Sequence, residues 1–125
     1  MIRWLSASFV TLMHRELTRE HGGPQGIRDP GLLESALARP RNLHAYDKVK
    51  DLHRLAAAYG YGISRDHPFV DGNKRVTLMA MYVFLKLNGV ELNASEEDAF
   101  VTIRDLAAGD LSEEDLADWL RRNSA

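Results

Sequence analysis

The segment from Val76 to Leu87 is the feature that most constrains how this chain can fold. Lys86 is the single charge in it, and its apolar residues lie on nearly every side of a helix. One stripe contains Val76, Met79, Ala80, Val83, Phe84 and Leu87, and the opposite side contains Leu78, Met81, Tyr82 and Leu85. A helix that is apolar all round has to be buried. We therefore predict that it forms the centre of the fold.

The remaining segments also have helical spacing, and none shows the strict alternation of a half-buried strand. Ser6 or Ser8 is predicted to cap a first helix that runs to about Glu20 and stops at a Gly-Gly-Pro cluster. Asp29 and Pro30 have the residue types of an N-cap and a first helical position. The sequence predicts an all-α helical bundle, with residues 1–125 forming one domain.

The middle of the chain contains a proline that predicts a break. Pro40 is expected to end the second helix, and 41–50 is expected to be an irregular, mobile connection. A third helix is predicted from about Val49 to Ser64, where Gly60 and Gly62 would let neighbouring helices approach closely. After Asn88-Gly89, two short acidic helices are predicted to begin at Ser95 and Ser112.

Charge and composition exclude several classes of function. Residues 1–90 carry 13 basic and 8 acidic side chains, whereas residues 91–125 carry 3 and 10. The acidic end disfavours direct DNA binding, which requires a continuous basic surface, and is interpreted as two solvated helices. The chain has no cysteine, no signal-peptide pattern and no apolar run long enough to cross a bilayer. We expect a cytoplasmic protein with no membrane contact.

Reactive side chains are concentrated in the ten residues from His67 to Val76. Because His67 precedes a proline, it is expected in an extended loop just before the apolar helix. Phe69 is the predicted hydrophobic pin of that loop. The N–H groups of Gly72 and Asn73, at the start of a helix, would form a concavity that binds phosphate.

The charged residues of this segment fit the same ligand. Asp71 could hold Mg²⁺ together with phosphate oxygens. Lys74 and Arg75 would neutralise phosphate charge, and Arg75 is suited to bidentate contact. Cations in the first turn of a helix oppose its dipole unless an anion binds nearby.

Each of these residues also has an ordinary structural explanation. His67, like His14, His21, His44 and His53, could be a structural histidine, and Asp71 could be a simple N-cap. Lys74 and Arg75 could be a solvated first turn. The combination within nine residues favours a functional site. A hydrolytic metal centre is disfavoured, because no second histidine lies nearby in the sequence.

The motif His67-Pro68-Phe69-Val70-Asp71-Gly72-Asn73-Lys74-Arg75 resembles the signature of the Fic/Doc superfamily. Residues 26–40, Gly-Ile-Arg-Asp-Pro-Gly-Leu-Leu-Glu-Ser-Ala-Leu-Ala-Arg-Pro, are similar to the N-terminal region of Doc-type members. AMP-transferring Fic members carry glycine where this chain has Lys74, and a second arginine where it has Leu78. Both differences indicate the Doc toxin branch, although Pro68 and Gly72 are more Fic-like.

The resemblance implies a kinase that transfers the γ-phosphate of ATP, with Mg²⁺, to a threonine of elongation factor Tu and arrests translation. It implies that His67 is the general base and that Asp71 positions Mg²⁺. The expected nucleotide-binding residues are Arg65, Phe69, Gly72, Asn73, Lys74 and Arg75. Lys74 is expected to invert the nucleotide so that the γ-phosphate faces His67.

Two alternatives remain beside the kinase: an AMP transferase on the same fold, and a catalytically silent helical module that binds a partner. The resemblance also implies a neutralising partner. The chain lacks the Ser/Thr-x-x-x-Glu-Gly/Asn inhibitory pattern. A separate, Phd-like antitoxin is therefore expected to place its C-terminal segment in a groove of this protein.

Overall fold

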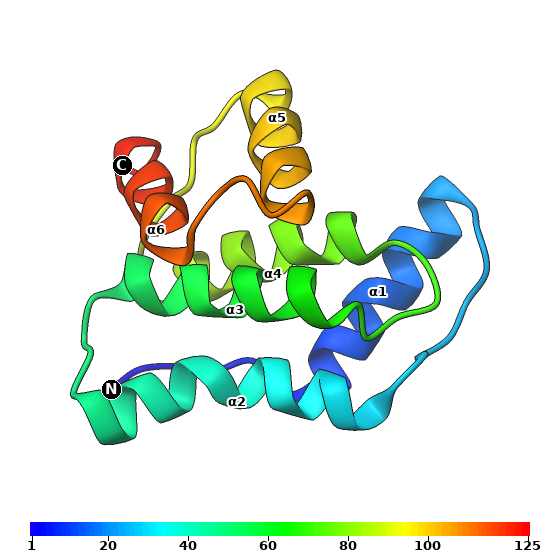
Figure 1. The fold of residues 1–125 in the computed structure, drawn as a ribbon, viewed down its shortest axis with the longest axis horizontal. Helices are drawn as coiled ribbons and strands as arrows, with labels where there is room; N and C mark the ends of the chain where they lie inside the picture. The colour runs from blue at the N-terminus through cyan, green and yellow to red at the C-terminus, as the bar shows by residue number, and fades with distance from the viewer.

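A computed structural model describes all residues, 1–125, as six helices with no strand. The helices are α1 (Ala7–His21), α2 (Pro30–Asp47), α3 (Leu52–Asp66), α4 (Asn73–Leu87), α5 (Glu96–Ala107) and α6 (Glu113–Arg122). In Figure 1, α3 and α4 lie in the middle, α2 runs below them, and α5 and α6 lie above. The all-α prediction is confirmed, and none of the helices has the length and apolar content needed to span a membrane.

Side-chain caps explain where five of the six helices begin. The N-cap oxygens of Ser6, Asp29, Asp51, Ser95 and Ser112 each accept a hydrogen bond from a backbone N–H in the first turn. These bonds satisfy N–H groups that have no partner inside the helix. The predicted starts at Ser6, Asp29, Ser95 and Ser112 are confirmed. The third helix begins at Leu52, three residues after the predicted Val49, because Asp51 provides the cap.

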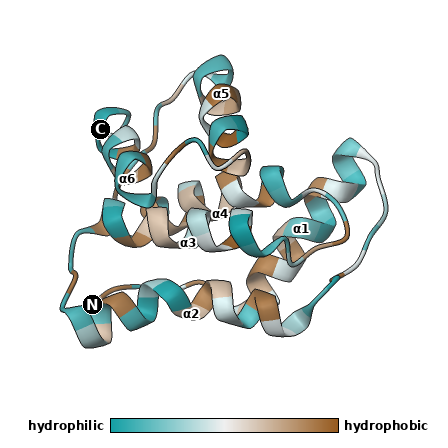
Figure 2. Ribbon diagram, in the orientation of Figure 1, coloured by the Kyte–Doolittle hydropathy of each residue, from teal (hydrophilic) through white to brown (hydrophobic).

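The core is centred on α3 and α4 together, so the predicted burial of the helix after the His67 loop is confirmed. Eight residues of α3 are buried, against six of α4. Helix α3 packs against α2, α4, α5 and α6, whereas Lys86 and Leu87 of α4 are exposed. Figure 2 shows hydrophobic segments of the helices turned toward one another and hydrophilic ones toward the outside. The apolar residues on all sides of α4 predicted that it is buried. They could not predict that the neighbouring α3 is buried to a similar extent.

Two glycines let α3 lie close to its neighbours, as predicted. A Cβ on Gly62 would lie 3.2 Å from the Cα of Ala36 on α2, and a Cβ on Gly60 would collide with Met81 on α4. Such contacts are tighter than side chains tolerate without a shift. Gly60 and Gly62 therefore set the spacing of the three central helices.

The predicted break at Pro40 is wrong. Helix α2 continues through Pro40 to Asp47, and Pro40 is buried. The missing N–H costs one hydrogen bond. Tertiary contacts hold the residues beyond it, because His44 lies edge-on to Trp4 with ring centroids 5.5 Å apart and the Arg41 guanidinium lies 5.6 Å from the Trp4 ring. The segment expected to be a mobile loop is thus mostly the last turns of a packed helix.

The acidic C-terminal helices are not simply solvated. The side chain of Glu113 is 9% exposed and accepts hydrogen bonds from Arg54 at 2.7 Å and from Arg39 at 3.2 Å. Asp98 accepts a hydrogen bond from the Trp119 indole at 2.8 Å. Acidic residues therefore attach α6 to α2 and α3, and α5 to α6. This arrangement corrects the interpretation of the tail as a pair of solvated helices.

Candidate active site

The segment from His67 to Gly72 connects α3 to α4, and both of its ends have left-handed backbone. His67 has φ 47° and ψ 58°, and Gly72 has φ 78°. The predicted extended conformation of His67 is wrong, because its N–H caps α3 by bonding to the Ile63 carbonyl at 3.1 Å. That turn overrides the local bias imposed by the following proline. A left-handed residue other than glycine costs about 1–2 kcal/mol, so surrounding contacts must hold it.

Phe69 anchors this loop to the core. Its side chain is 1% exposed and stacks on the ring of His14, with centroids 3.9 Å apart. The Asn73 side chain accepts a hydrogen bond from the Phe69 N–H and donates one to the Phe69 carbonyl, both at 3.0 Å. The predicted pin is confirmed. The Phe69 side chain is buried in the core and the Asn73 amide braces the loop, while the expected roles of Phe69 and Asn73 in nucleotide binding stay predictions.

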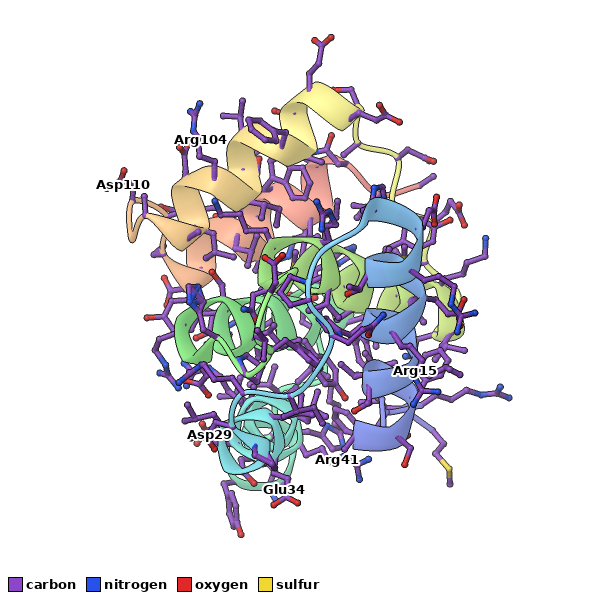
Figure 3. The ribbon with its side chains drawn as sticks, turned by 90° about the vertical axis from the view of Figure 1, so that its right-hand side faces the viewer. Arg15, Asp29, Glu34, Arg41, Arg104 and Asp110 are labelled. Carbon is purple, nitrogen blue, oxygen red and sulfur yellow. The ribbon has the colours of Figure 1, made fainter.

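A cavity of about 660 Å³ opens beside the loop and the start of α4. Cavities of this size hold drug-sized or nucleotide-sized ligands. Its near wall contains the predicted residues His67, Asp71, Gly72, Asn73, Lys74 and Arg75, together with Val70 and Leu78. Figure 3 looks onto the end of the molecule where α3 passes into α4, with α5 above. The structure therefore places six of the predicted site residues around one cavity.

Helix α5 forms the opposite wall with Glu96, Ala99, Phe100, Ile103 and Arg104. Arg104, labelled on α5 in Figure 3, adds a third cation to those of Lys74 and Arg75. The sequence did not predict this wall, because the acidic residues 91–125 were interpreted as solvated helices. One signal was available: Phe100 is a large apolar residue next to the acidic first turn of α5, and it is 68% exposed in the structure.

The reactive groups of the near wall have no partners within the protein. The hydrogen bonds of His67 and Asp71 use their backbone atoms, and the side chains of Lys74 and Arg75 form neither a hydrogen bond nor an ion pair. Helix α4 also differs from the other five in lacking a side-chain cap. Its first N–H groups, with the positive end of the helix dipole, are thus open to an anion.

Asp71 fits a magnesium ion only if the ligand supplies other oxygens. No group of three or more histidine, aspartate or glutamate side chains is arranged to hold a metal ion. Magnesium at nucleotide sites commonly uses one or two carboxylates together with phosphate oxygens. The unpartnered Asp71 carboxylate at the cavity wall is compatible with that arrangement.

Arg65 does not line this cavity, unlike the six predicted site residues named above. Its guanidinium lies 5.6 Å from the Tyr61 ring centre and pairs with Asp66 at 3.1 Å. It lines a second cavity of about 640 Å³ between α3 and the α5–α6 connection. His67 is exposed and lines both cavities.

Comparison with known proteins identifies the family of this chain. A sequence model of the Fic/DOC family matches residues 4–85. Protein kinase doc of Escherichia phage P1 is 35% identical over 121 residues, which cover 97% of this chain and 95% of the relative. Toxin Doc of Mycolicibacterium smegmatis is 43% identical over 74 residues, 58% of this chain and 57% of that protein. The chain therefore belongs to the Fic/DOC family, in the branch of the Doc toxins.

Proposed function

We propose that this Doc-type toxin is a Mg-ATP-dependent kinase that phosphorylates a hydroxyl group of a protein. One observation carries the proposal: a base, a carboxylate and two cations, all without protein partners, surround one cavity at an uncapped helix start. Groups left free in this way suit a ligand that provides phosphate oxygens and a metal ion. The name of the phage P1 relative, Protein kinase doc, supports the same reaction.

The proposed step is a direct phosphoryl transfer. The acceptor oxygen forms a bond to the γ-phosphorus of ATP, the bond from that phosphorus to the β,γ-bridging oxygen breaks, and ADP leaves. The His67 imidazole accepts the hydroxyl proton, while Lys74, Arg75 and the first N–H groups of α4 hold phosphate oxygens. Mg²⁺ bound at Asp71 would neutralise phosphate charge. The access to His67 from two cavities lets the nucleotide and the acceptor approach it from different sides.

The second candidate is transfer of AMP on the same fold. Lys74 and Leu78 both line the cavity, so the apolar Leu78 side chain occupies the wall where AMP-transferring members place an arginine. A cation at 74 and none at 78 favours holding the nucleotide with its γ-phosphate toward His67. A silent binding module is disfavoured because it would leave four reactive side chains unpaired without a use.

The test is transfer of radiolabel from ATP to proteins of a bacterial lysate in the presence of Mg²⁺. Transfer of γ-label that disappears in His67→Ala supports the kinase. Transfer of α-label would show that the protein transfers AMP and is not a kinase. The absence of both labels would favour a binding module. His21→Ala is the matched control, since His21 is an exposed histidine at the last residue of α1 and does not line the cavity. It should transfer label at the wild-type rate.

We further propose that the acceptor is a threonine of elongation factor Tu. The assay above tests this directly, because the labelled band can be digested and the modified peptide identified by mass spectrometry. A γ-labelled threonine peptide of elongation factor Tu is expected. If only other proteins carry the label, the proposed kinase activity stands and elongation factor Tu is rejected as its target.

A neutralising antitoxin is the proposed partner. Val70 and Phe100, on opposite walls of the cavity, are 51% and 68% exposed and leave apolar surface open to water. A C-terminal segment of a Phd-like antitoxin, folded as an amphipathic helix, would cover this surface. Co-purification from the native operon should yield a complex that loses the partner in Phe100→Asp. Recovery of the toxin without a small partner would reject the proposal.

A further inference from the structure

The loop that carries His67 is held by residues that do not line the cavity. Its backbone enters in a left-handed conformation at His67 and leaves in another at Gly72. A left-handed histidine followed by proline is not a conformation that the free chain prefers. Its persistence requires contacts that hold the carbonyl groups of the turn in place.

Arg28 makes these contacts at the first end of the loop. Its Nε donates to the His67 carbonyl and its Nη2 to the Asp66 carbonyl, both at 2.7 Å. One planar guanidinium therefore spans two successive carbonyls at the C-terminal end of α3, where a cation is also favoured by the helix dipole. Arg28 forms no ion pair with a carboxylate, and both of its side-chain hydrogen bonds go to this turn.

The backbone beside Arg28 pairs with the same loop. The N–H groups of Arg28 and Asp29 bond to the Pro68 carbonyl at 2.7 and 3.1 Å, and the Val70 N–H bonds to the Gly26 carbonyl at 3.1 Å. Ile27 and Phe69 form an antiparallel bridge. The backbone pairing locates the middle of the loop, which leaves the orientation of the His67 peptide to the Arg28 side chain.

His14 of α1 holds the other end. Its Nε2 lies 2.6 Å from the Asp71 carbonyl, and its ring is 3% exposed and nearly parallel to that of Phe69, with an interplanar angle of 8°. A carbonyl oxygen can only accept, so Nε2 carries the proton. Thr18 donates to the His14 carbonyl at 2.8 Å and lies beside the same ring nitrogen. His14 therefore fixes the peptide that precedes Gly72 and α4.

We propose that Arg28 and His14 are positioning residues that act on different steps of the reaction. This inference rests on the proposed phosphoryl transfer. Arg28 orients the peptide of the base, so its loss lowers kcat and leaves nucleotide affinity unchanged. His14 orients the peptide of Asp71, so its loss weakens Mg-ATP binding and raises KM for ATP. Both residues contact the backbone of the site, but neither side chain lines the cavity.

The experiment compares Arg28→Met, Arg28→Lys and His14→Phe with the wild-type protein. Arg28→Met should lower kcat by about 100-fold, the usual effect of a misplacement of about 1 Å, with KM for ATP within about twofold. Arg28→Lys should recover part of that loss, since an ammonium can reach one of the two carbonyls. His14→Phe keeps the stacking on Phe69 but removes the donor, and should raise KM for ATP about 10-fold, as expected for a lost hydrogen bond.

Arg19→Met is the matched control, because Arg19 is an exposed arginine whose ion pair is with Glu16 on the same helix. It should leave both constants unchanged. Equal loss of kcat and ATP affinity in Arg28→Met, in proportion to a lower thermal midpoint, would reduce Arg28 to a general structural role and overturn the inference.

Hydrogen exchange separates failure of this inference from failure of the proposed function. If the wild-type protein transfers no γ-phosphate, the proposed reaction is wrong, but the loop can still be observed. Exchange at the backbone N–H groups of His67, Phe69, Val70 and Asp71 should then be faster in Arg28→Met and His14→Phe than in Arg19→Met. Unchanged exchange in both variants would refute the role of Arg28 and His14 as clamps of the loop.

Discussion

Replacing Glu113 with glutamine should destabilise the fold, because Glu113 joins three helices. Its carboxylate on α6 accepts hydrogen bonds from Arg39 on α2 and Arg54 on α3. A glutamine amide keeps one acceptor but turns an NH₂ group toward the arginine donors. Hydrogen bonds to charged groups contribute about 1.5–3 kcal/mol each.

Exposure to solvent reduces the loss of unfolding free energy that we expect for Glu113→Gln. The side chains of Arg39 and Arg54 are 32% and 25% exposed, so water can replace part of what they lose. We expect the free energy of unfolding to fall by about 2 kcal/mol. At about 4 °C per kcal/mol, interpolated for a chain of 125 residues, the midpoint of thermal unfolding should fall by about 8 °C.

The difference between the two proteins should depend on pH with a known sign. Burial opposes ionisation of Glu113, but the hydrogen bonds from Arg39 and Arg54 outweigh it and hold the pKa of the carboxyl below its ordinary value. A lowered folded-state pKa stabilises the fold fully above the unfolded-state pKa, about 4.3. That stabilisation disappears as the pH falls through the lower folded-state pKa. Wild-type and variant stabilities should therefore converge in acid.

Urea unfolding followed by far-ultraviolet circular dichroism, at neutral pH and at several acidic values, measures both effects. Glu114→Gln is the control, because Glu114 is the exposed neighbour in the same first turn. It should change the free energy of unfolding by less than about 0.5 kcal/mol. An equally small effect of Glu113→Gln at neutral pH, or a difference that persists unchanged in acid, would refute the reasoning.

Three further predictions concern single residues. Gly62→Ala should lower the free energy of unfolding by about 1–3 kcal/mol, because its Cβ would lie 3.2 Å from the Cα of Ala36; a neutral result in urea titration would show that α2 and α3 can separate freely. Trp119→Phe should cost about 1–3 kcal/mol by removing the indole hydrogen bond to Asp98, and Trp119→Phe in an Asp98→Ala background, which has no side-chain acceptor, should cost less if that bond is the cause. Lys74→Met should weaken ATP binding about 10-fold in titration calorimetry, as for a lost charge-assisted contact, and unchanged affinity would remove Lys74 from the phosphate site.

Much of the fold and part of the site were predictable from local sequence. The Ser6, Asp29, Ser95 and Ser112 starts were correct because an N-cap bonds to N–H groups within three residues of itself. Glycines at 60 and 62 predicted close helix contact for a similar reason, since the absence of a Cβ is a property of the residue alone.

The errors occurred where distant segments decide the outcome. Pro40 does not end α2, because Trp4 holds the turns that follow it. His67 is not extended, because it caps α3 and because Arg28, 39 residues away, binds its carbonyl. Burial of Phe69 against His14 likewise depends on α1. Trp4, Arg28 and His14 lie outside any short window of sequence around the residues that they hold.

The sequence by itself determined the all-α class, most helix starts and the chemistry concentrated between His67 and Arg75, since these depend on residue type and short spacing. Only the tertiary structure decided that α5 closes the cavity, that Arg65 faces a second one, and that Glu113 is buried between two arginines. These features are contacts between segments far apart in the chain. Their free energy comes from burial and pairing that exist only after the helices have packed.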